Sequence, residues 1–239
     1  MLMKVKLNST EEQLTFLFNI SVSTVSKIFS TWITFLSHEL SQFIKWPTLE
    51  EIKVHYPACF TKWDKIVAII DCFEIKTERP SHIEANSLVF STYKNSPTVK
   101  FLIACTPGGL VSFISQPAGG NMSDKQIVIE SRLPEKFLPG EQCMADKGFT
   151  IQGELLEKGV ELIILPFARK GQGFSDENSK LNRDAAHTRI HIERVINRVR
   201  DYRILSSGPV PISTFDLIGP IVNVCCALTN LKPSIIPYS

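Results

Sequence analysis

The feature that most constrains the fold is an unbroken apolar run, residues 66–70, followed directly by Asp71. A strand with one solvated face alternates apolar and polar residues. This run has no polar position, so it predicts a strand that is covered on both faces. The chain has 239 residues, of which 44% are hydrophobic and 21% charged, and this is enough to bury such a sheet in a globular domain.

Further strands and helices alternate after this run. Strands are predicted at residues 88–93, 100–105, 110–116, 141–146 and 160–165, and helices at about 123–132, 151–157, 182–201 and 217–231. A glycine-rich, polar stretch at 168–179 predicts a loop. The order predicts an α/β domain over residues 65–233, a mixed sheet with flanking helices in the order of a ribonuclease H-like fold.

A small helical unit is predicted in front of this domain. Ser9 or Thr10 can cap a first helix, whose apolar side includes Leu14, Leu17 and Phe18. After a break at residues 19–21, a longer helix has apolar residues at three- and four-residue spacing, namely Val22, Val25, Ile28, Phe29, Trp32, Phe35 and Leu36.

Small polar residues lead the longer helix, which is typical of a helix-turn-helix. We therefore predict a helix-turn-helix at residues 1–45 and a linker at 46–64, with Ser23, Thr24 and Lys27 as DNA contacts. A helical hairpin that only packs against the rest of the chain is the alternative interpretation.

The net charge of +2 does not by itself indicate a nucleic-acid partner, so any basic DNA-binding surface must be local. The predicted helix at 182–201 carries several arginines, and we take Arg189, Arg194 and Arg198, together with Lys147, as candidate phosphate contacts. A solvated basic helix face is the alternative.

The six cysteines include no Cys-x-x-Cys pair, which argues against a zinc knuckle or a disulfide framework and for reduced, buried thiols in an intracellular protein. Residues 1–10 contain no secretory signal. The longest apolar stretch, 217–231, is too short to span a membrane and contains Pro220. We predict a core helix there and no membrane partner.

Three acids are placed so that they can converge. Asp71 and Asp146 each end an apolar strand, and Glu193 lies on the long helix beside apolar residues that indicate a face turned toward the sheet. Convergent carboxylates repel each other unless a cation is present, and ligands that are all oxygen favour Mg²⁺ or Mn²⁺. Two such ions can promote in-line attack on phosphorus, so phosphodiester chemistry is the natural assignment.

Four short runs, Ile70–Ile75, Gly120–Lys125, Met144–Phe149 and His191–Arg194, resemble the DDE superfamily endonuclease domain. The resemblance is to the branch of harbinger-like transposases and their relatives fused to THAP zinc fingers. The acids are separated by 75 residues (146 − 71) and 47 residues (193 − 146), which suits that family. Phe73 stands where such sequences more often have a small polar residue.

The resemblance implies that Asp71, Asp146 and Glu193 are the catalytic, metal-binding triad, that the cofactor is Mg²⁺ or Mn²⁺, and that DNA is the partner. It also implies a nuclear location, with the cytoplasm as the alternative. As a further partner, the resemblance implies either a second copy of the chain or a separate DNA-recognition protein.

The resulting hypothesis is a transposase-derived, metal-dependent endonuclease that cleaves DNA phosphodiester bonds. A domesticated, catalytically inactive DNA-binding protein is the main alternative, and a phosphatase for small substrates is a weaker one. Among other polar residues, Asp124 is expected to favour its helix dipole or to assist the metals. Glu74 is expected to face away from Asp71, and His191 to be exposed or to contact phosphate.

Overall fold

The computed structural model describes residues 1–60, 62–146, 148–165 and 191–234. The chain begins with three helices, α1 (Leu2–Leu7), α2 (Glu11–Phe18) and α3 (Val22–Leu40). Thr10 forms a capping box with Gln13 at the start of α2, and Ser21 caps α3 by accepting a hydrogen bond from the Thr24 backbone N–H. The two predicted helices are therefore confirmed, while α1 was not predicted.

The apolar face of α3 is only partly buried. Val25, Phe29 and Ile33 are buried, whereas Trp32 and Phe35 are 49% and 50% exposed. Contact with the rest of the molecule is limited to one stripe of the helix, which is narrower than the apolar face that the sequence predicts. Leu17 and Phe18 of α2 are also exposed, and only Leu14 of the predicted apolar side is buried.

Residues 41–60 and 62–64, most of which were predicted as a linker, pack against the rest of the chain. They contain η1 (Ser41–Phe43), α4 (Leu49–Lys53) and η2 (Ala58–Phe60). The ring of Trp46 meets those of Phe113 and Phe137 edge to face, and Phe60 is fully buried.

In the described part of the chain, seven strands form one mixed sheet, ordered β2-β3-β1-β6-β7, with β4 and β5 also paired to β3. β1 is antiparallel to β3 and parallel to β6, which is in turn parallel to β7. The strands are β1 (Ile66–Lys76), β2 (Phe90–Ser91), β3 (Ser96–Cys105), β4 (Val111–Ile114), β5 (Ala118–Gly119), β6 (Gln142–Asp146) and β7 (Glu161–Leu165).

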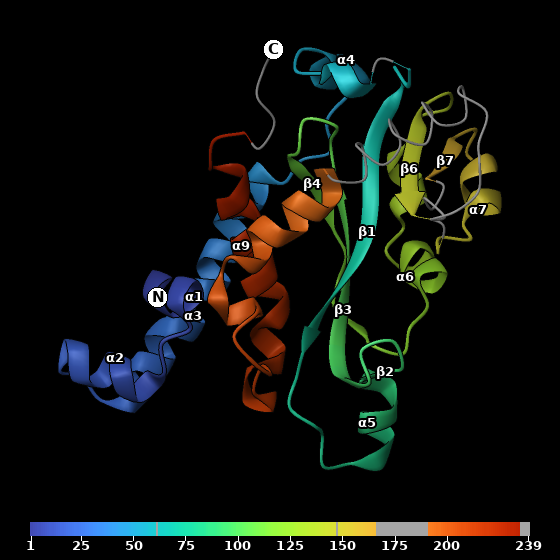
Figure 1. Cartoon of the computed structure of the whole chain (residues 1–239). Coiled ribbons are helices and arrows are strands. Elements are labelled where there is room, and N and C mark those ends of the chain that lie inside the picture. Colours follow the sequence, from blue (N-terminus) through green and yellow to red (C-terminus); the bar gives the residue numbers. More distant parts are fainter. Residues whose placement is uncertain (61, 147, 166–190, 235–239) are drawn as a thin grey trace, which may run out of the picture.

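Helices cover both faces of this sheet (Figure 1). On one face lie α6 (Asp124–Glu130), η3 (Leu133–Lys136) and α7 (Gln152–Leu156). On the other face lie the helical residues 191–200, then η4 (Arg203–Leu205), η5 (Ile212–Leu217) and α9 (Ile218–Asn230). The fold is thus the predicted ribonuclease H-like mixed sheet with flanking helices.

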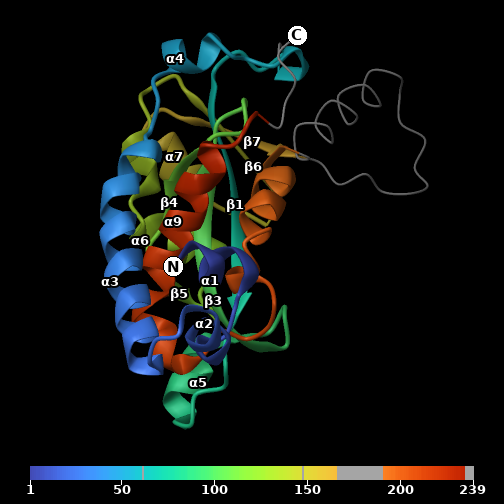
Figure 2. The same ribbon diagram turned by 90° about the vertical axis from the view of Figure 1, so that its left-hand side faces the viewer.

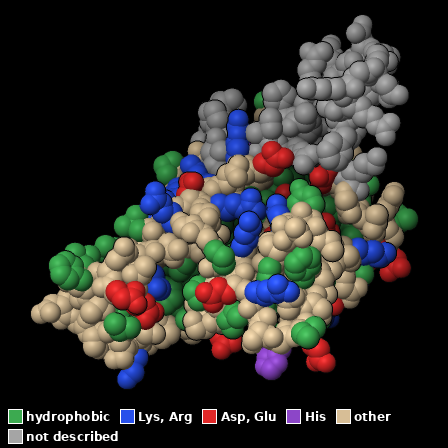
Figure 3. Space-filling model, turned by 60° about the horizontal axis from the view of Figure 1, so that its bottom comes forward, with side chains coloured by type: hydrophobic (Ala, Val, Ile, Leu, Met, Phe, Trp, Pro, Cys, Tyr) green, Lys and Arg blue, Asp and Glu red, His purple; other side chains and the backbone are tan. Residues whose placement is uncertain are grey.

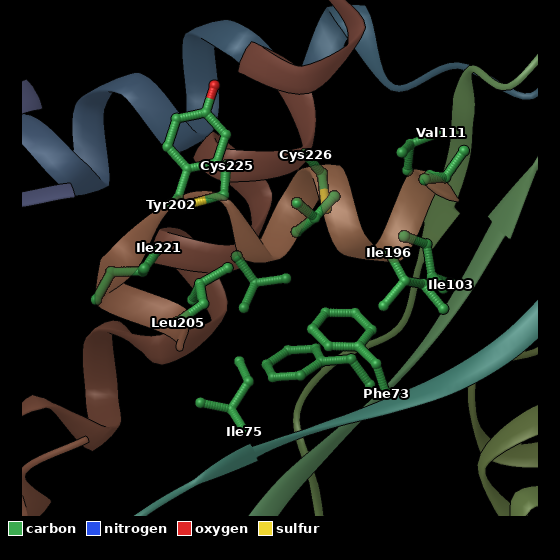
Figure 4. Close-up of a cluster of buried hydrophobic side chains, with 14 of the residues drawn as sticks. Phe73, Ile75, Ile103, Val111, Ile196, Tyr202, Leu205, Ile221, Cys225 and Cys226 are labelled. Atoms are coloured by element: carbon green, nitrogen blue, oxygen red, sulfur yellow. The ribbon is translucent and has the colours of Figure 1, made fainter. Parts of the chain in front are cut away.

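The N-terminal unit is attached through α9. Helix α3 runs beside α9 (Figure 2), and the Asn223 side chain donates a hydrogen bond to the Ser37 carbonyl at 3.3 Å. Figure 4 shows the core between the sheet and the helices on this face, where Ile103 of β3 lies beside Ile196, and Cys225 of α9 lies beside Tyr202. Residues 212–230 are long and apolar enough to cross a membrane by length and composition. In this fold, however, α9 is the predicted core helix.

One sequence prediction needs correction, and two others fall wholly or partly outside the described residues. Only part of the predicted strand at 88–93 is a strand: its first two residues end α5 (Ile83–Val89), the next two form β2, and residues 92–93 lie in a turn. Its short apolar run does not distinguish a helix from a strand. The predicted loop at 168–179 and residues 182–190 of the long helix lie outside the described residues, whereas residues 191–200 are helical as predicted.

Candidate functional site

Asp71 lies in the middle of β1 rather than at its end, which corrects the sequence prediction. The apolar run stops at Ile70, but the strand continues to Lys76 because β3 keeps pairing with it, and Asp71 lies opposite Ile103. One carboxylate oxygen of Asp71 accepts a hydrogen bond from the Cys72 backbone N–H at 2.7 Å.

Asp146 is the last residue of β6, as predicted, and it lies next to Asp71 across the parallel pair. The register joins Ile70 to Ala145, so the two aspartates follow at the next position of each strand. Side chains alternate between the faces of a strand. Because Ile69 and Met144 belong to the core cluster under residues 191–200, both aspartates belong to that same face.

Glu193 comes from the helix that covers this face. Its neighbours Ile192, Val195 and Ile196 are buried against the sheet. Glu193 itself is exposed, so its side chain is not buried under the helix in the way that the apolar pattern indicated. It points instead into an open cleft at the end of β6.

This cleft has a volume of about 720 Å³ and brings all three predicted acids together. We call Asp71, Asp146 and Glu193 the acidic trio. The cleft is also lined by Glu74, Asp124, Lys94, Lys100, Arg200 and Tyr93. Figure 3 shows Lys and Arg side chains gathered in the middle of the face that comes forward from the lower end of Figure 1, with acidic side chains near them.

Comparisons with known proteins fit this geometry. Residues 70–230 match the family described as DDE superfamily endonuclease. The chain belongs to the DDE superfamily endonuclease family. Residues 1–42 match the helix-turn-helix of DDE superfamily endonuclease, which agrees with the predicted N-terminal unit. No curated protein and no solved structure matches the chain.

The remaining predicted contacts of this DDE endonuclease chain differ in their surroundings. Ser23, Thr24 and Lys27 are exposed on α3 of the helix-turn-helix. The Arg198 guanidinium donates to the Pro233 carbonyl at 2.6 Å, so at least part of it is engaged with the C-terminal segment. Arg194 is exposed and does not line the cleft. Lys147 and Arg189 lie outside the described residues.

Several cleft residues of the DDE domain were missed or misjudged from the sequence. Lys100 was overlooked, although a lysine inside an otherwise apolar strand is a visible signal. Glu74 does extend from the opposite face of β1, as its odd offset from Asp71 predicts. It still lines the cleft, because β1 continues past the end of β6 and the cleft is open to both faces there.

His191 was expected to be exposed or to contact phosphate, and this was wrong. It is 7% exposed, its Nε2 lies 3.5 Å from the Cys59 sulfur, and its ring lies 5.3 Å from that of Phe60. His191 is the first described residue of its helix, and its side chain is buried against η2.

The chemistry of the DDE cleft is dominated by oxygen donors. Cys72 is the one thiol in its lining, and burial, followed by the charges of Asp124 and Asp71, raises the pKa of this thiol. The thiol therefore stays protonated at neutral pH and is a poor metal ligand. Phe73 also borders the cleft, but its ring is 2% exposed, stacks on Phe101 at 5.6 Å, and has the Arg200 guanidinium 6.0 Å from its centre.

DDE superfamily nucleases generally use divalent metals. Among the described residues, no three Asp, Glu, His or Cys side chains are close enough to hold an ion as they stand. The acidic trio therefore shares one cleft without forming a preassembled ion site.

Proposed function

We propose that this protein cuts DNA phosphodiester bonds with divalent metal ions held by the acidic trio. The observation that carries the proposal is the single cleft that Asp71, Asp146 and Glu193 line, in a chain of the DDE superfamily endonuclease family. Two of these acids come from adjacent parallel strands and the third from the covering helix.

The residues of the cleft fit such ions in their donor chemistry. Carboxylate oxygens are the ligands that Mg²⁺ and Mn²⁺ prefer, and the protonated Cys72 thiol does not compete with them. When bound, two such ions would activate a water or a 3′-hydroxyl and stabilise the oxygen that leaves phosphorus.

The protein's own residues would hold the DNA around this centre. Arg200 and Lys94 line the cleft and can neutralise phosphates without reading the sequence. The helix-turn-helix at residues 1–42 would hold the duplex through the exposed start of α3, where Ser23, Thr24 and Lys27 lie.

Nicking of supercoiled plasmid by the purified protein with Mg²⁺ or Mn²⁺ tests this proposal, run beside Asp146→Asn. Asp216→Asn is the matched control, because Asp216 is an exposed aspartate that does not line the cleft. We expect metal-dependent nicking by the parent protein and the control, and its loss in Asp146→Asn with an unchanged melting temperature. Full activity of Asp146→Asn would refute the assignment.

A DNA-binding protein that no longer cuts is the second candidate, and Phe73 is the observation that favours it. A bulky, buried ring borders the cleft beside Asp71, where resembling sequences more often have a small polar residue. Calorimetric titration with Mn²⁺ separates the two candidates. DNA binding without Mn²⁺ binding would support the inactive protein, whereas Mn²⁺ binding that is weakened in Asp146→Asn would support the nuclease.

A further inference from the structure

Lys100 is a buried lysine in the middle of β3, and only 9% of it is exposed. Its ammonium donates hydrogen bonds to the Met122 carbonyl at 2.8 Å and to one carboxylate oxygen of Asp124 at 3.2 Å. A carboxylate oxygen of Glu74, its partner in the register of β1 and β3, lies 4.0 Å away. Lys100 thus joins β1, β3 and the start of α6 at the floor of the cleft.

Glu74 is fixed in turn by Thr98, whose hydroxyl donates to the other carboxylate oxygen at 2.7 Å. The loop before α6 lies tightly against this group because of Gly120. A Cβ atom at Gly120 would stand 2.1 Å from the Thr98 hydroxyl and 2.6 Å from the Val89 carbonyl, so only glycine fits there. This close approach brings Met122 and Asp124 over Lys100.

Asp124 lies between the two chain segments that carry the aspartates of the acidic trio. On one side, its carboxylate lies close enough to the Cys72 thiol to raise the pKa of that thiol, and Cys72 directly follows the first aspartate. On the other side lies Gly148, which lines the same cleft and is so near that an added Cβ atom would stand 3.9 Å from the second Asp124 oxygen. Gly148 lies two residues after the second aspartate.

Stability alone does not explain this arrangement. Taking an ammonium and two carboxylates out of water costs free energy that their attraction only partly repays, and an apolar residue in place of a buried ion pair is often as stable or more so. What such a group can provide is a defined position for the elements that it joins.

We propose that Lys100 is a positioning residue: by holding Asp124 between Cys72 and Gly148, it fixes the spacing of the two segments that bear Asp71 and Asp146. The inference rests on the proposed function, because the spacing matters only if those acids act together. Lys100 and Asp124 would contact neither substrate nor metal. They act through the backbone that carries the trio.

Three variants test the proposal: Lys100→Met, Asp124→Asn and the double variant. Lys100→Met removes the charge and keeps the length of the side chain, and Asp124→Asn removes the charge and keeps the size of a side chain that is 33% exposed. Lys125→Met is the matched control. It breaks another lysine–carboxylate pair of α6, with Glu154 at 2.6 Å, which does not line the cleft.

The first measurement is hydrogen–deuterium exchange of the metal-free proteins. We expect exchange at residues 72–73 and 148–149 to quicken about tenfold or more in Lys100→Met, as for loss of a charge-assisted hydrogen bond. Asp124→Asn should have the same effect, and the double variant no greater one. Unchanged exchange in Lys100→Met, or effects that multiply in the double variant, would overturn the proposal.

The second measurement is the rate of plasmid nicking as a function of Mn²⁺ concentration. We expect the rate of Lys100→Met at saturating Mn²⁺ to fall by about tenfold to a hundredfold, as for misplaced reacting groups. The Mn²⁺ midpoint should not weaken, because removing a cation from an acidic cleft does not disfavour cations. A weaker midpoint with an unchanged saturating rate would contradict positioning. If even the parent protein fails to nick, the proposed function fails, and the exchange experiment still decides the role of Lys100.

Discussion

The sheet around the cleft and the N-terminal helical unit, α1 to α3, use their apolar residues in different ways. In β1, β3 and β6 almost every apolar side chain is buried, and residues such as Phe101 are 1% exposed. In the helical unit only Val5 of α1, Leu14 of α2 and one stripe on α3 are buried, while Phe16 is 91% exposed and Trp32 is 49% exposed.

The difference separates two kinds of task. A residue on a strand that is packed on both faces has a fixed position, which is what the acidic trio needs if it is to act as one centre. A helix that is attached along one stripe presents its other side chains to whatever approaches. We therefore expect chemistry to depend on the sheet, and the helical unit to contribute only to holding DNA.

The largest expected effect is on the sheet side of this comparison. In Asp71→Asn, nicking should fall by about a thousandfold, because one carboxylate of a metal centre contributes several kcal/mol of charge stabilisation. Binding to DNA, measured by fluorescence anisotropy without metal, should not weaken. Asp64→Asn, an exposed aspartate just before β1, serves as the control. Nicking by Asp71→Asn at the parent rate would remove the cleft from the mechanism.

The second prediction compares two phenylalanines. Phe101→Ala should lower the free energy of unfolding by about 3–5 kcal/mol, because it leaves a cavity beside Phe73 in the sheet. Phe16→Ala should change it by no more than about 0.5 kcal/mol, since its ring is already in water. Urea denaturation of both variants measures this. A loss above about 2 kcal/mol for Phe16→Ala would mean that its ring is buried in solution.

The same contrast decides how much of the fold could be predicted from the sequence. The strands at residues 66–70, 141–146 and 160–165 were predicted because apolar runs in a parallel sheet are continuous. The extension of β1 to Lys76 was not, because beyond Ile70 the strand is held by pairing with β3, and pairing is a long-range property. The partial exposure of α3 was missed for a related reason. Helical periodicity predicts an apolar face but does not indicate how much of it another element covers.

For the site, the sequence and its family resemblance led to the three acids that the cleft brings together, but not to the group around Lys100. Acids after apolar runs are conspicuous in a sequence. Lys100 itself stands out in its apolar strand, but its partner Asp124 becomes evident only when β5 and the start of α6 fold over β3 and bring that carboxylate within 3.2 Å of the ammonium. Such a contact joins residues 24 positions apart, and no local pattern encodes it.

The third prediction concerns alkaline pH and again separates the two regions, because all six cysteines follow residue 58. Burial raises the pKa of Cys105, Cys143 and Cys225 above the ordinary value of 9.0. Below pH 9 the thiols are protonated in both the folded and the unfolded protein, and the free energy of unfolding is at its full value. As pH rises above 9, the thiols ionise first in the unfolded protein, which lowers the free energy of unfolding.

Each such thiol should therefore cost about 1.4 kcal/mol of unfolding free energy per pH unit above about pH 9. Urea denaturation at about pH 8, 9 and 10 measures the slope, and Cys143→Ala should reduce it by one thiol's share. An identical slope in Cys143→Ala would mean that this thiol titrates normally in the folded protein.

The smallest expected effect is on the helical side. Lys27 is exposed near the start of α3, and each lysine–phosphate contact releases about one counterion on binding. Lys27→Ala should therefore lower DNA affinity several-fold, reduce the slope of log K against log salt by about one, and leave nicking at saturating protein unchanged. Lys53→Ala on α4, also exposed, is the control and should keep the parent slope. If Lys27→Ala also keeps the parent slope of log K against log salt, α3 packs against the domain without binding DNA, and the basic residues of the cleft must hold the substrate alone.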